Sequence, residues 1–349
     1  MDNKEQIFIE DIEDIVKRCE NIWLLLSNST IYITGGTGFI GTWILESLYS
    51  ANITYNLNIK AVILTRNINT FREKAPHLVD YTNFTFEVGD IRYFKSKAVG
   101  CDYIIHAATD ASAELNEKNP KLMYETILEG TKNILEFAVD MKIKKILFLS
   151  SGAIYGQQPW EMTHISESWN GSLDCKDVKN TYAEAKRAAE LLCSIYIKQF
   201  NLNITTARIF SSIGPYLPIN THFAIGNFIL NSIEKKPIIV KGNGLPCRSF
   251  LYISDMTVWL WNMLVYGENA KAYNVGSRKS ISIKDLAKKV SETLDGNEYQ
   301  ILGEDDKGWN LGRYVPDNTL IKYELNVEEK ISLDEAILRT AVWNGWIKA

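Results

Sequence analysis

A tyrosine and a lysine in this sequence stand at a spacing that suits proton transfer coupled to hydride transfer. Tyr182 and Lys186 are four residues apart, so on a helix they share one face. An ammonium group beside a phenol favours the phenolate and lowers the phenol pKa from its ordinary value of ~10. Such a tyrosine can remove or return a hydroxyl proton while a nicotinamide accepts or gives hydride. Ser151, after the apolar run 145–150, adds a hydroxyl at the carboxyl end of a predicted strand.

Three glycines mark a phosphate-binding turn near the start of the chain. Gly35, Gly38 and Gly41 have GxxGxxG spacing between the apolar run 31–34 and a helical pattern over 41–49. In such a strand–turn–helix unit, the glycines allow a tight turn and a close approach of the backbone to a pyrophosphate. The helix N-terminus then offers free N–H groups to the phosphates. We expect contacts to a dinucleotide from Gly35, Thr37, Gly38, Phe39, Ile40 and Gly41.

The end of the second predicted strand, 60–65, bears on the choice between NAD and NADP. An acidic side chain there would bind the ribose hydroxyls of NAD, but the sequence has Thr65 and Arg66. A guanidinium beside a small hydroxyl suits a 2′-phosphate, so the sequence favours NADP over NAD. The alternative is that Arg66 stacks on the adenine or lies in solvent. Further cofactor contacts are expected after the next two strands, from Asp90, Ile91, Ala107 and Ala108.

Short β-branched runs alternate with longer helical patterns as far as residue 210. This alternation predicts a parallel sheet with helices on both faces, the doubly wound α/β arrangement of a Rossmann domain. Beyond it the pattern is mixed, with helices near 224–235 and 283–295 and short strands that include 272–275. A smaller C-terminal α+β lobe is therefore expected to close over the sheet. We divide the chain into a helical extension (1–28), a dinucleotide-binding domain (29–210) and a substrate-binding lobe (211–349).

The composition is that of an ordinary folded protein. Of 349 residues, 46% are hydrophobic and 23% are charged, and the net charge of −4 argues against a nucleic-acid partner. The five cysteines form no CxxC pair and the four histidines do not cluster, so no metal is expected. Apolar residues between 12 and 26 recur at helical spacing and predict one amphipathic helix. No apolar run is long enough to span a membrane, and we expect a cytoplasmic protein.

The order of the motifs resembles that of the extended short-chain dehydrogenase/reductase family, and in particular its nucleotide-sugar epimerase/dehydratase branch. The resemblance runs from about residue 31 to 317 and implies that Ser151, Tyr182 and Lys186 form the catalytic set. It also implies a nucleoside-diphosphate sugar as substrate, hydride transfer at sugar C4, and a homodimer built from helices near 124–141 and 182–200. The motifs are the glycine loop, His106-Ala107-Ala108, Ser-Ser-Gly-Ala-Ile-Tyr-Gly at 150–156, Tyr182-x-x-x-Lys186 and Gly214-Pro215.

The second lobe carries residues that resemble the family's substrate contacts. The segment 242–255 resembles the one whose arginine, here Arg248, clamps the sugar-nucleotide diphosphate, and Arg313 resembles a second clamp. A planar fork of donors suits phosphate oxygens, although either arginine could instead form a surface ion pair. Ser211 stands where relatives usually carry a phosphate-contacting asparagine. Asn227 is a further expected substrate contact.

Two small residues depart from the family's pattern. The branch's 4,6-dehydratases have an Asp-Glu pair where this chain has Gly152 and Ala153, and its decarboxylases have a glutamate in place of Ala153. What remains is chemistry without an extra acid or base, namely 4-epimerisation or 4-keto reduction, which we rank nearly equally. Small residues that leave room for a sugar to turn favour an epimerase. Thr65 and Arg66 favour an NADPH-dependent reductase.

Two other functions stay open. A 4,6-dehydratase would have to use Asp110 or Glu114, from the loop after His106, as its acid or base. A non-catalytic dinucleotide-binding sensor or scaffold is expected to lose the tyrosine or the lysine of the catalytic set. Both are present here, which favours an enzyme.

Overall fold

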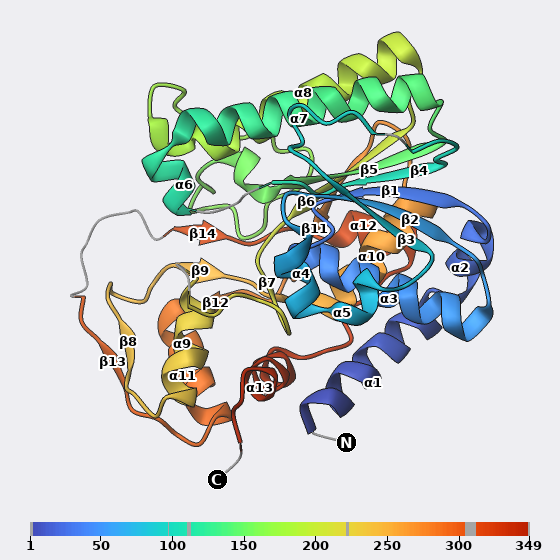
Figure 1. The fold of residues 1–349 in the computed structure, drawn as a ribbon. Helices are drawn as coiled ribbons and strands as arrows, with labels where there is room; N and C mark the ends of the chain where they lie inside the picture. Colours follow the sequence, from blue (N-terminus) through green and yellow to red (C-terminus); the bar gives the residue numbers. More distant parts are fainter. Residues whose placement is uncertain (1–2, 97, 110–112, 221–222, 304–311, 348–349) are drawn as a thin grey trace.

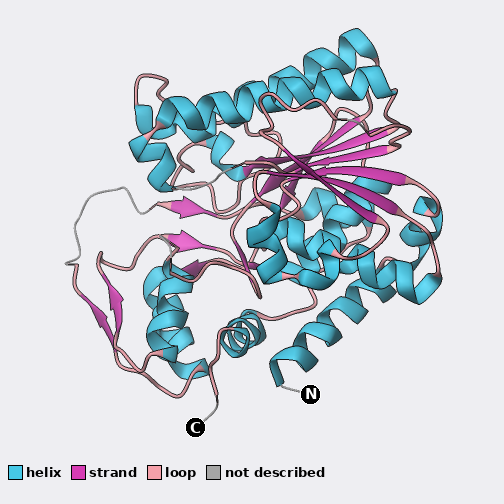
Figure 2. Cartoon of the chain, viewed as in Figure 1, coloured by secondary structure: helices cyan, strands magenta, loops and turns pink. Residues whose placement is uncertain are grey.

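A parallel β-sheet forms the centre of the molecule (Figures 1 and 2). The computed structural model describes residues 3–96, 98–109, 113–220, 223–303 and 312–347. Every neighbouring pair of strands in the sheet is parallel. In spatial order, the seven strands are β11 (Ala272–Val275), β6 (Ile204–Ile209), β5 (Lys145–Ser151), β4 (Tyr103–His106), β1 (Thr30–Thr34), β2 (Lys60–Thr65) and β3 (Phe84–Val88).

The chain starts in the middle of this sheet and winds outward in both directions. It runs from β1 to the edge strand β3, crosses back to β4 beside β1, and continues through β5 to β6. The doubly wound α/β fold predicted from the sequence is therefore confirmed. Because the winding direction reverses between β1 and β4, the loops after these two strands diverge. Open α/β sheets bind their ligands at this point.

Helices cover both faces of the sheet (Figure 1). Strand β5 is buried along its whole length, which explains its almost continuous apolar sequence. One face carries α6 (Ala113–Lys118), α7 (Pro120–Met141) and α8 (Thr181–Phe200), of which α7 and α8 pack lengthwise against each other. The other face carries α3 (Phe39–Tyr55), α4 (Ile68–Lys74), α5 (Pro76–Val79), α10 (Ile253–Tyr266) and α12 (Thr319–Leu325).

One strand lies where the sequence analysis did not place it. The sequence pattern assigns residues 272–275 to the smaller lobe, but the structure corrects this: they form β11, which pairs with β6 in the main sheet. Tyr273 and Val275 are buried there. The strand thus covers apolar surface at the sheet edge that would otherwise be exposed, and α12 packs over it. The chain returns to the sheet after residue 210.

Short strands and helices make up the smaller lobe. The helices α9 (Ala224–Ile233), α11 (Ile283–Thr293) and α13 (Leu333–Trp343) pack together. The strand pairs are β8 (Ile238–Val240) with β13 (Tyr299–Ile301), β7 (Ser212–Ile213) with β10 (Leu251–Tyr252), and β9 (Cys247–Arg248) with both β12 (Ile281–Ser282) and β14 (Arg313–Tyr314). Strand β14 comes close to the carboxyl end of β5, since its Tyr314 hydroxyl would lie 2.7 Å from a Cβ on Gly152.

The N-terminal extension forms two helices rather than the single one predicted, α1 (Asn3–Arg18) and α2 (Glu20–Leu26). The break falls at Cys19, whose backbone leaves the helical region and whose carbonyl accepts hydrogen bonds from the first turn of α2. Helix α1 packs on α3, α10 and α13. The Asp11 carboxylate accepts from Tyr252, at 2.5 Å, and from Arg339, so buried polar contacts tie the extension to the lobe.

Neither a membrane-spanning helix nor a metal-binding cluster is found among the described residues. None of their helices combines the length and apolar character of a membrane span. The same ranges hold no group of three or more histidine, cysteine, aspartate or glutamate side chains that could bind a metal ion.

Candidate active site

The glycine turn forms a cradle of bare backbone at the end of β1. Gly35 has φ +71°, and a Cβ on it would lie 2.6 Å from the carbonyl group of Ala107. A Cβ on Gly41 would lie 2.2 Å from the Gly35 oxygen. Helix α3 begins at Phe39 after Gly38, and no side chain caps its first amides. The free amides and the missing side chains fit the pyrophosphate of a dinucleotide, as the sequence predicts.

Two arginines, Arg66 after β2 and Arg92 after β3, act on one carboxylate, that of Asp90. The Thr65 hydroxyl lies 3.3 Å from that of Thr37, which ties β2 to the glycine turn. Arg66 is exposed. Asp90 accepts from the Arg92 side chain at 3.0 and 2.7 Å, and Arg92, with a smaller contribution from Arg66, lowers the pKa of Asp90. The carboxylate predicted to flank the adenine is therefore already paired.

Two further predicted cofactor positions, Ile91 and Ala108, lie in different surroundings. Ile91 is buried against Gly130 of α7, where a Cβ would lie 2.9 Å away. The amide of Ala108 donates to the Thr34 hydroxyl at 3.1 Å, which fixes the loop after β4 beside the cradle.

Strand β5 ends in two serines that point to different partners. The Ser150 hydroxyl donates to Glu190 at 2.5 Å, and Glu190 is paired in turn with Arg208. The Ser151 hydroxyl instead accepts from the Ala153 amide at 3.1 Å, as the cap of a short 3₁₀ helix, η1 (Gly152–Tyr155). It also faces the phenol of Tyr182, whose pKa it acts to lower. Both serines therefore reach α8, Ser150 at Glu190 and Ser151 at Tyr182.

Tyr182 and Lys186 lie on one face of α8, but they act on different neighbours. A second 3₁₀ helix, η2 (Val178–Asn180), leads directly into α8. The Lys186 amine donates to the Leu149 carbonyl at 2.7 Å and to the Thr109 hydroxyl at 2.8 Å. Burial lowers the pKa of Lys186 to about 7. Burial raises the pKa of Tyr182, and the opposing influence is the hydrogen bond with Ser151. The predicted lowering of the Tyr182 pKa by the lysine is not what this structure shows, because the amine is directed back into β5.

Sequence reasoning missed one hydroxyl, that of Tyr314 on β14. Its phenol donates a hydrogen bond to the Ile209 carbonyl at 3.4 Å, and the nearby Ser151 hydroxyl acts to lower its pKa. Its ring packs against Phe210 with the centroids 4.5 Å apart. Burial raises the pKa of Tyr314 well above its usual range. The available signal was its place next to Arg313, since adjacent strand residues face opposite sides and only one can face the site.

The space above Gly152 is filled, which corrects the expectation that it leaves room for a sugar to turn. A Cβ at position 152 would lie 2.6 Å from the Phe210 ring and 2.7 Å from the Tyr314 hydroxyl. The glycine is thus needed for the close approach of these two aromatic side chains. It does not by itself open a cavity.

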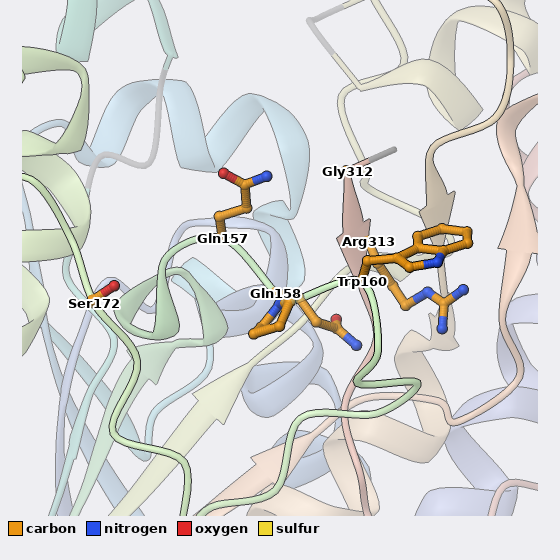
Figure 3. A pocket seen from close by; sticks show the side chains of 7 residues that line it. Gln157, Gln158, Trp160, Ser172, Gly312 and Arg313 are labelled. Atoms are coloured by element: carbon orange, nitrogen blue, oxygen red, sulfur yellow. The ribbon is translucent and has the colours of Figure 1, made fainter. Parts of the chain in front are cut away.

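The two arginines expected to clamp a diphosphate point in different directions. Arg248 stands opposite Tyr314 between β9 and β14, so these side chains share one face. Its guanidinium donates to the Gly312 carbonyl at 2.6 Å. Arg313 lies on the other face, 5.1 Å from the centre of the Trp160 ring, and its buried Nε has no partner within the described ranges. Figure 3 shows Arg313 and Trp160 beside a cavity. The cavity has a volume of about 240 Å³ and is lined also by Gln157, Gln158, Pro159, Ser172 and Gly312.

The other predicted substrate and acid–base residues are more scattered. Ser211 follows β6, and its carbonyl accepts from the Leu251 amide. Asn227 is half-buried in the first turns of α9. Glu114 is largely exposed and pairs with Lys118 at 2.7 Å, so its carboxylate is directed to solvent. Asp110 lies outside the described residues.

Fold and motifs together define the family. The model of the NAD dependent epimerase/dehydratase family matches residues 31–276, and the chain belongs to this family. The chain is 30% identical over 311 residues to UDP-glucuronic acid decarboxylase 2 of Arabidopsis thaliana, covering 88% of this chain but 66%, just under two thirds, of that protein. It is 29% identical to UDP-glucuronic acid decarboxylase 1 of Xenopus tropicalis, with 89% of this chain and 70% of that protein covered.

Solved structures share the fold at lower identity. A UDP-N-acetylglucosamine 4-epimerase from Methanobrevibacter ruminantium M1 superposes with a TM-score of 0.78 at 21% identity, covering 91% of this chain and 98% of that one. A dTDP-glucose 4,6-dehydratase from Streptomyces venezuelae with NAD bound gives 0.76 at 23% identity, covering 90% and 96%. At these identities the similarity establishes the architecture alone.

Proposed function

We propose that this protein interconverts a hydroxyl group and a ketone at C4 of a nucleoside-diphosphate sugar, using NAD or NADP. The observation that carries the proposal is the Ser151–Tyr182 hydroxyl pair at the carboxyl edge of the sheet, across the switch point from the glycine cradle. Hydroxyl groups that hydrogen-bond a sugar oxygen and exchange its proton are what oxidation of an alcohol requires.

Each residue of the set has a role that its contacts support. Tyr182 takes or returns the proton of the sugar hydroxyl, and Ser151 orients that oxygen through its own hydroxyl. The Lys186 amine, held on the Leu149 carbonyl, is placed to bind a ribose hydroxyl. The cradle at Gly35 and the start of α3 would hold the pyrophosphate. When bound, the dinucleotide supplies the hydride acceptor or donor.

Dehydration and decarboxylation are not proposed, although the curated relatives are named as decarboxylases. Gly152 and Ala153 follow Ser151, and neither can transfer a proton. Among the described residues, the Ser151 hydroxyl accepts from a backbone amide and influences the pKa of two phenols, and none of these groups is a carboxyl. Glu114, considered as a substitute acid, is paired with Lys118 in solvent.

The structure bears on the choice between a 4-ketoreductase and a 4-epimerase. Arg66, an exposed residue whose charge acts on Asp90 together with that of Arg92, supports a 2′-phosphate and hence NADPH consumption by a reductase. Because Phe210 and Tyr314 fill the space above Gly152, this glycine no longer favours an epimerase by leaving room for a sugar to turn. NAD in the related dehydratase structure supports the alternative, an epimerase that retains its cofactor.

The test begins with the protein as purified. We would denature it, identify any released dinucleotide by mass, and then assay UDP-glucose, UDP-glucuronic acid and a dTDP-4-keto-6-deoxy sugar. Retained NAD with inversion at C4 of a UDP-sugar identifies the epimerase. NADPH-dependent reduction of the 4-keto sugar identifies the reductase. Release of CO₂ from UDP-glucuronic acid, or binding of dinucleotide with no turnover of any sugar, contradicts the proposal.

We also propose a homodimer formed through α7 and α8. Both helices carry exposed apolar side chains, with exposed fractions of 63% for Leu191, 39% for Ile195 and 39% for Tyr124. Light scattering on a sizing column measures the mass directly. We expect a dimer for the natural chain and a monomer for Leu191→Asp, and a monomeric natural chain would contradict the proposal.

A further inference from the structure

A largely buried ion pair connects the elements that carry the catalytic set. Arg208 in β6 and Glu190 in α8 pair at 2.8 Å, with side-chain exposed fractions of 15% and 16%. Arg208 stands opposite Ser150 in the register of β5 and β6, one residue before Ser151. Glu190 lies one helical turn after Lys186. We infer that Arg208 and Glu190 are positioning residues that fix β5, η1 and α8 relative to one another, and with them the catalytic set. This inference rests on the proposed function.

The hydrogen bonds of the Glu190 carboxylate join the helix to two strands. Nε of Arg208 donates to both carboxylate oxygens, at 3.2 and 3.3 Å, and Nη2 donates to Oε2 at 2.8 Å. The Ser150 hydroxyl donates to Oε1 at 2.5 Å. A carboxylate that accepts from a guanidinium and a hydroxyl has little freedom to shift. The pair therefore fixes α8 against both β5 and β6.

The third nitrogen of the Arg208 guanidinium reaches η1. Nη1 donates to the Tyr155 phenol at 2.8 Å and to the Glu167 carbonyl at 3.2 Å. Tyr155 is fully buried, and its phenol donates in turn to the Asn274 side chain in β11 at 2.8 Å. Tyr155 is the last residue of η1, and Ser151 caps the first turn. Because η1 is only one short turn, a fixed Tyr155 limits how far Ser151 can move.

A second arginine ties η1 to α8. Arg187 follows Lys186 in α8, and its guanidinium donates to the carbonyl groups of Ile154 and Asn170, both at 2.9 Å. The turn after Ser151 is thus bound from α8 at its backbone and from β6 at its last side chain. Of the two arginines, Arg208 also binds the Glu190 carboxylate, so it connects η1, α8 and the sheet at once.

Positioning is what such a pair contributes. Burying two charges costs desolvation energy that offsets much of their attraction, so a buried ion pair adds little net stability. The planar fork of an arginine, in contrast, fixes the direction of each hydrogen bond. Proton transfer depends steeply on distance and direction, and an error of ~1 Å in a catalytic group can cost ~10²-fold in rate. We therefore expect the loss of Arg208 to lower turnover and to spare substrate binding.

The test compares Arg208→Met and Arg208→Lys in the full-length enzyme. With the nucleotide sugar that the natural enzyme oxidises, we expect the kcat of Arg208→Met to fall about 10²-fold. KM and dinucleotide affinity should stay within about threefold, since the pair acts through other residues. Arg208→Lys keeps a charge beside Glu190, but its single amine cannot also hold Tyr155. Its kcat should recover to about tenfold below the natural value, the effect of one lost hydrogen bond.

The matched control is Arg339→Met, in the ion pair between α13 and α1. Arg339 and Asp11 have exposed fractions of 16% and 2%, and Asp11 also accepts from the Tyr252 phenol. The same kinds of groups therefore meet there, away from the catalytic set. Arg339→Met should lower the urea midpoint about as much as Arg208→Met does and leave kcat unchanged. Circular dichroism at the assay temperature shows that each variant is folded.

A second readout does not depend on turnover. In η1 the Ala153 amide donates to the Ser151 hydroxyl at 3.1 Å, and the Gly156 amide donates to the Ala153 carbonyl at 3.0 Å. In Arg208→Met, hydrogen exchange at these amides should be about tenfold faster, and exchange in α7 should stay as in the natural protein. Arg339→Met should leave exchange in η1 unchanged. Mass spectrometry of peptides from both elements measures these rates.

The outcomes separate this inference from the proposed function. A folded Arg208→Met enzyme with the natural kcat would overturn the inference, and so would an equal loss of kcat in Arg339→Met. A rise in KM alone, or faster exchange in α7 as well as η1, would also overturn it. If Arg208→Met does not fold, Arg208→Lys decides by the same comparison. If the natural protein oxidises no nucleotide sugar, the proposed function fails, and hydrogen exchange still decides whether the pair fixes η1.

Discussion

The glycine cradle and the hydroxyl cluster lie at the same edge of the sheet but are built differently. The cradle is a short stretch of one chain segment, 35–41, and works through bare backbone that a Cβ would fill. The hydroxyl cluster joins Ser151, Tyr182 and Tyr314, from a strand, a helix and the smaller lobe. A local turn can hold phosphate with backbone amides, whereas directed proton transfer needs side chains that only the folded chain brings together.

The comparison predicts that damage to the cluster abolishes turnover while dinucleotide binding persists. In Tyr182→Phe, we expect kcat to fall about 10³-fold, because the group that exchanges the sugar proton is gone. Dinucleotide affinity should stay within about threefold, since the cradle is untouched. Steady-state kinetics and fluorescence titration measure the two quantities. Tyr196→Phe, on the same helix, is the control, and turnover at the natural rate in Tyr182→Phe would remove the tyrosine from its role.

Damage to the cradle should have the opposite signature. In Gly35→Ala, the new Cβ meets the Ala107 backbone at 2.6 Å, and we expect dinucleotide affinity to fall about 10²-fold. Gly100→Ala is a matched control, because Gly100 has the same φ of +71° with no atom within 4 Å of its Cβ position. The left-handed backbone should cost both variants ~1 kcal/mol of stability, and Gly35→Ala should lose more because its Cβ also meets the Ala107 backbone. Equal dinucleotide affinity in the two variants would contradict the proposal that the glycine turn holds the pyrophosphate.

Arg66, at the end of β2, tests whether the protein prefers NADPH to NADH. We expect Arg66→Ala to weaken NADPH binding about tenfold and to leave NADH binding unchanged, since only NADPH has the 2′-phosphate. Isothermal titration with both dinucleotides measures this. Arg72→Ala, which removes an exposed ion pair with Asp80, should affect neither. Equal losses for both dinucleotides would assign Arg66 to the adenine instead.

The smallest effect concerns stability at the base of the cluster. Burial lowers the pKa of Lys186 from 10.5 to about 7. Between these values the unfolded chain binds a proton that the folded chain does not, so this group makes unfolding less favourable as pH rises. Relative to Lys186→Met, the natural protein should gain ~1 kcal/mol per pH unit across this range. Urea unfolding at several pH values measures the slope, with Lys198→Met as the exposed control on α8. If the unfolding free energies of the natural protein and Lys186→Met change with pH in parallel, the pKa of Lys186 is not lowered in the folded protein.

Several structural features could be predicted because they depend on residues that are close in the sequence. The alternation of strands and helices gave the doubly wound sheet, and the strand–turn–helix pattern placed the cradle. The two helices of the N-terminal extension were harder to predict. The helical spacing of apolar residues continues through Cys19, but the helix itself breaks there. The edge strand at 272–275 looked like part of the lobe, because a short apolar run carries no information about its partner.

The chemistry of the cluster was only partly determined by the sequence. Residue types and spacing suggested Ser151, Tyr182 and Lys186, and the resemblance to the family implied that they form one catalytic set. They could not show that the lysine turns back to the Leu149 carbonyl, that Tyr314 arrives from β14, or that Phe210 fills the space above Gly152. The sequence by itself determined which groups are present and the local backbone of the glycine turn. The tertiary structure decided which hydroxyl groups touch, because hydrogen-bond direction and burial depend on contacts between segments far apart in the chain.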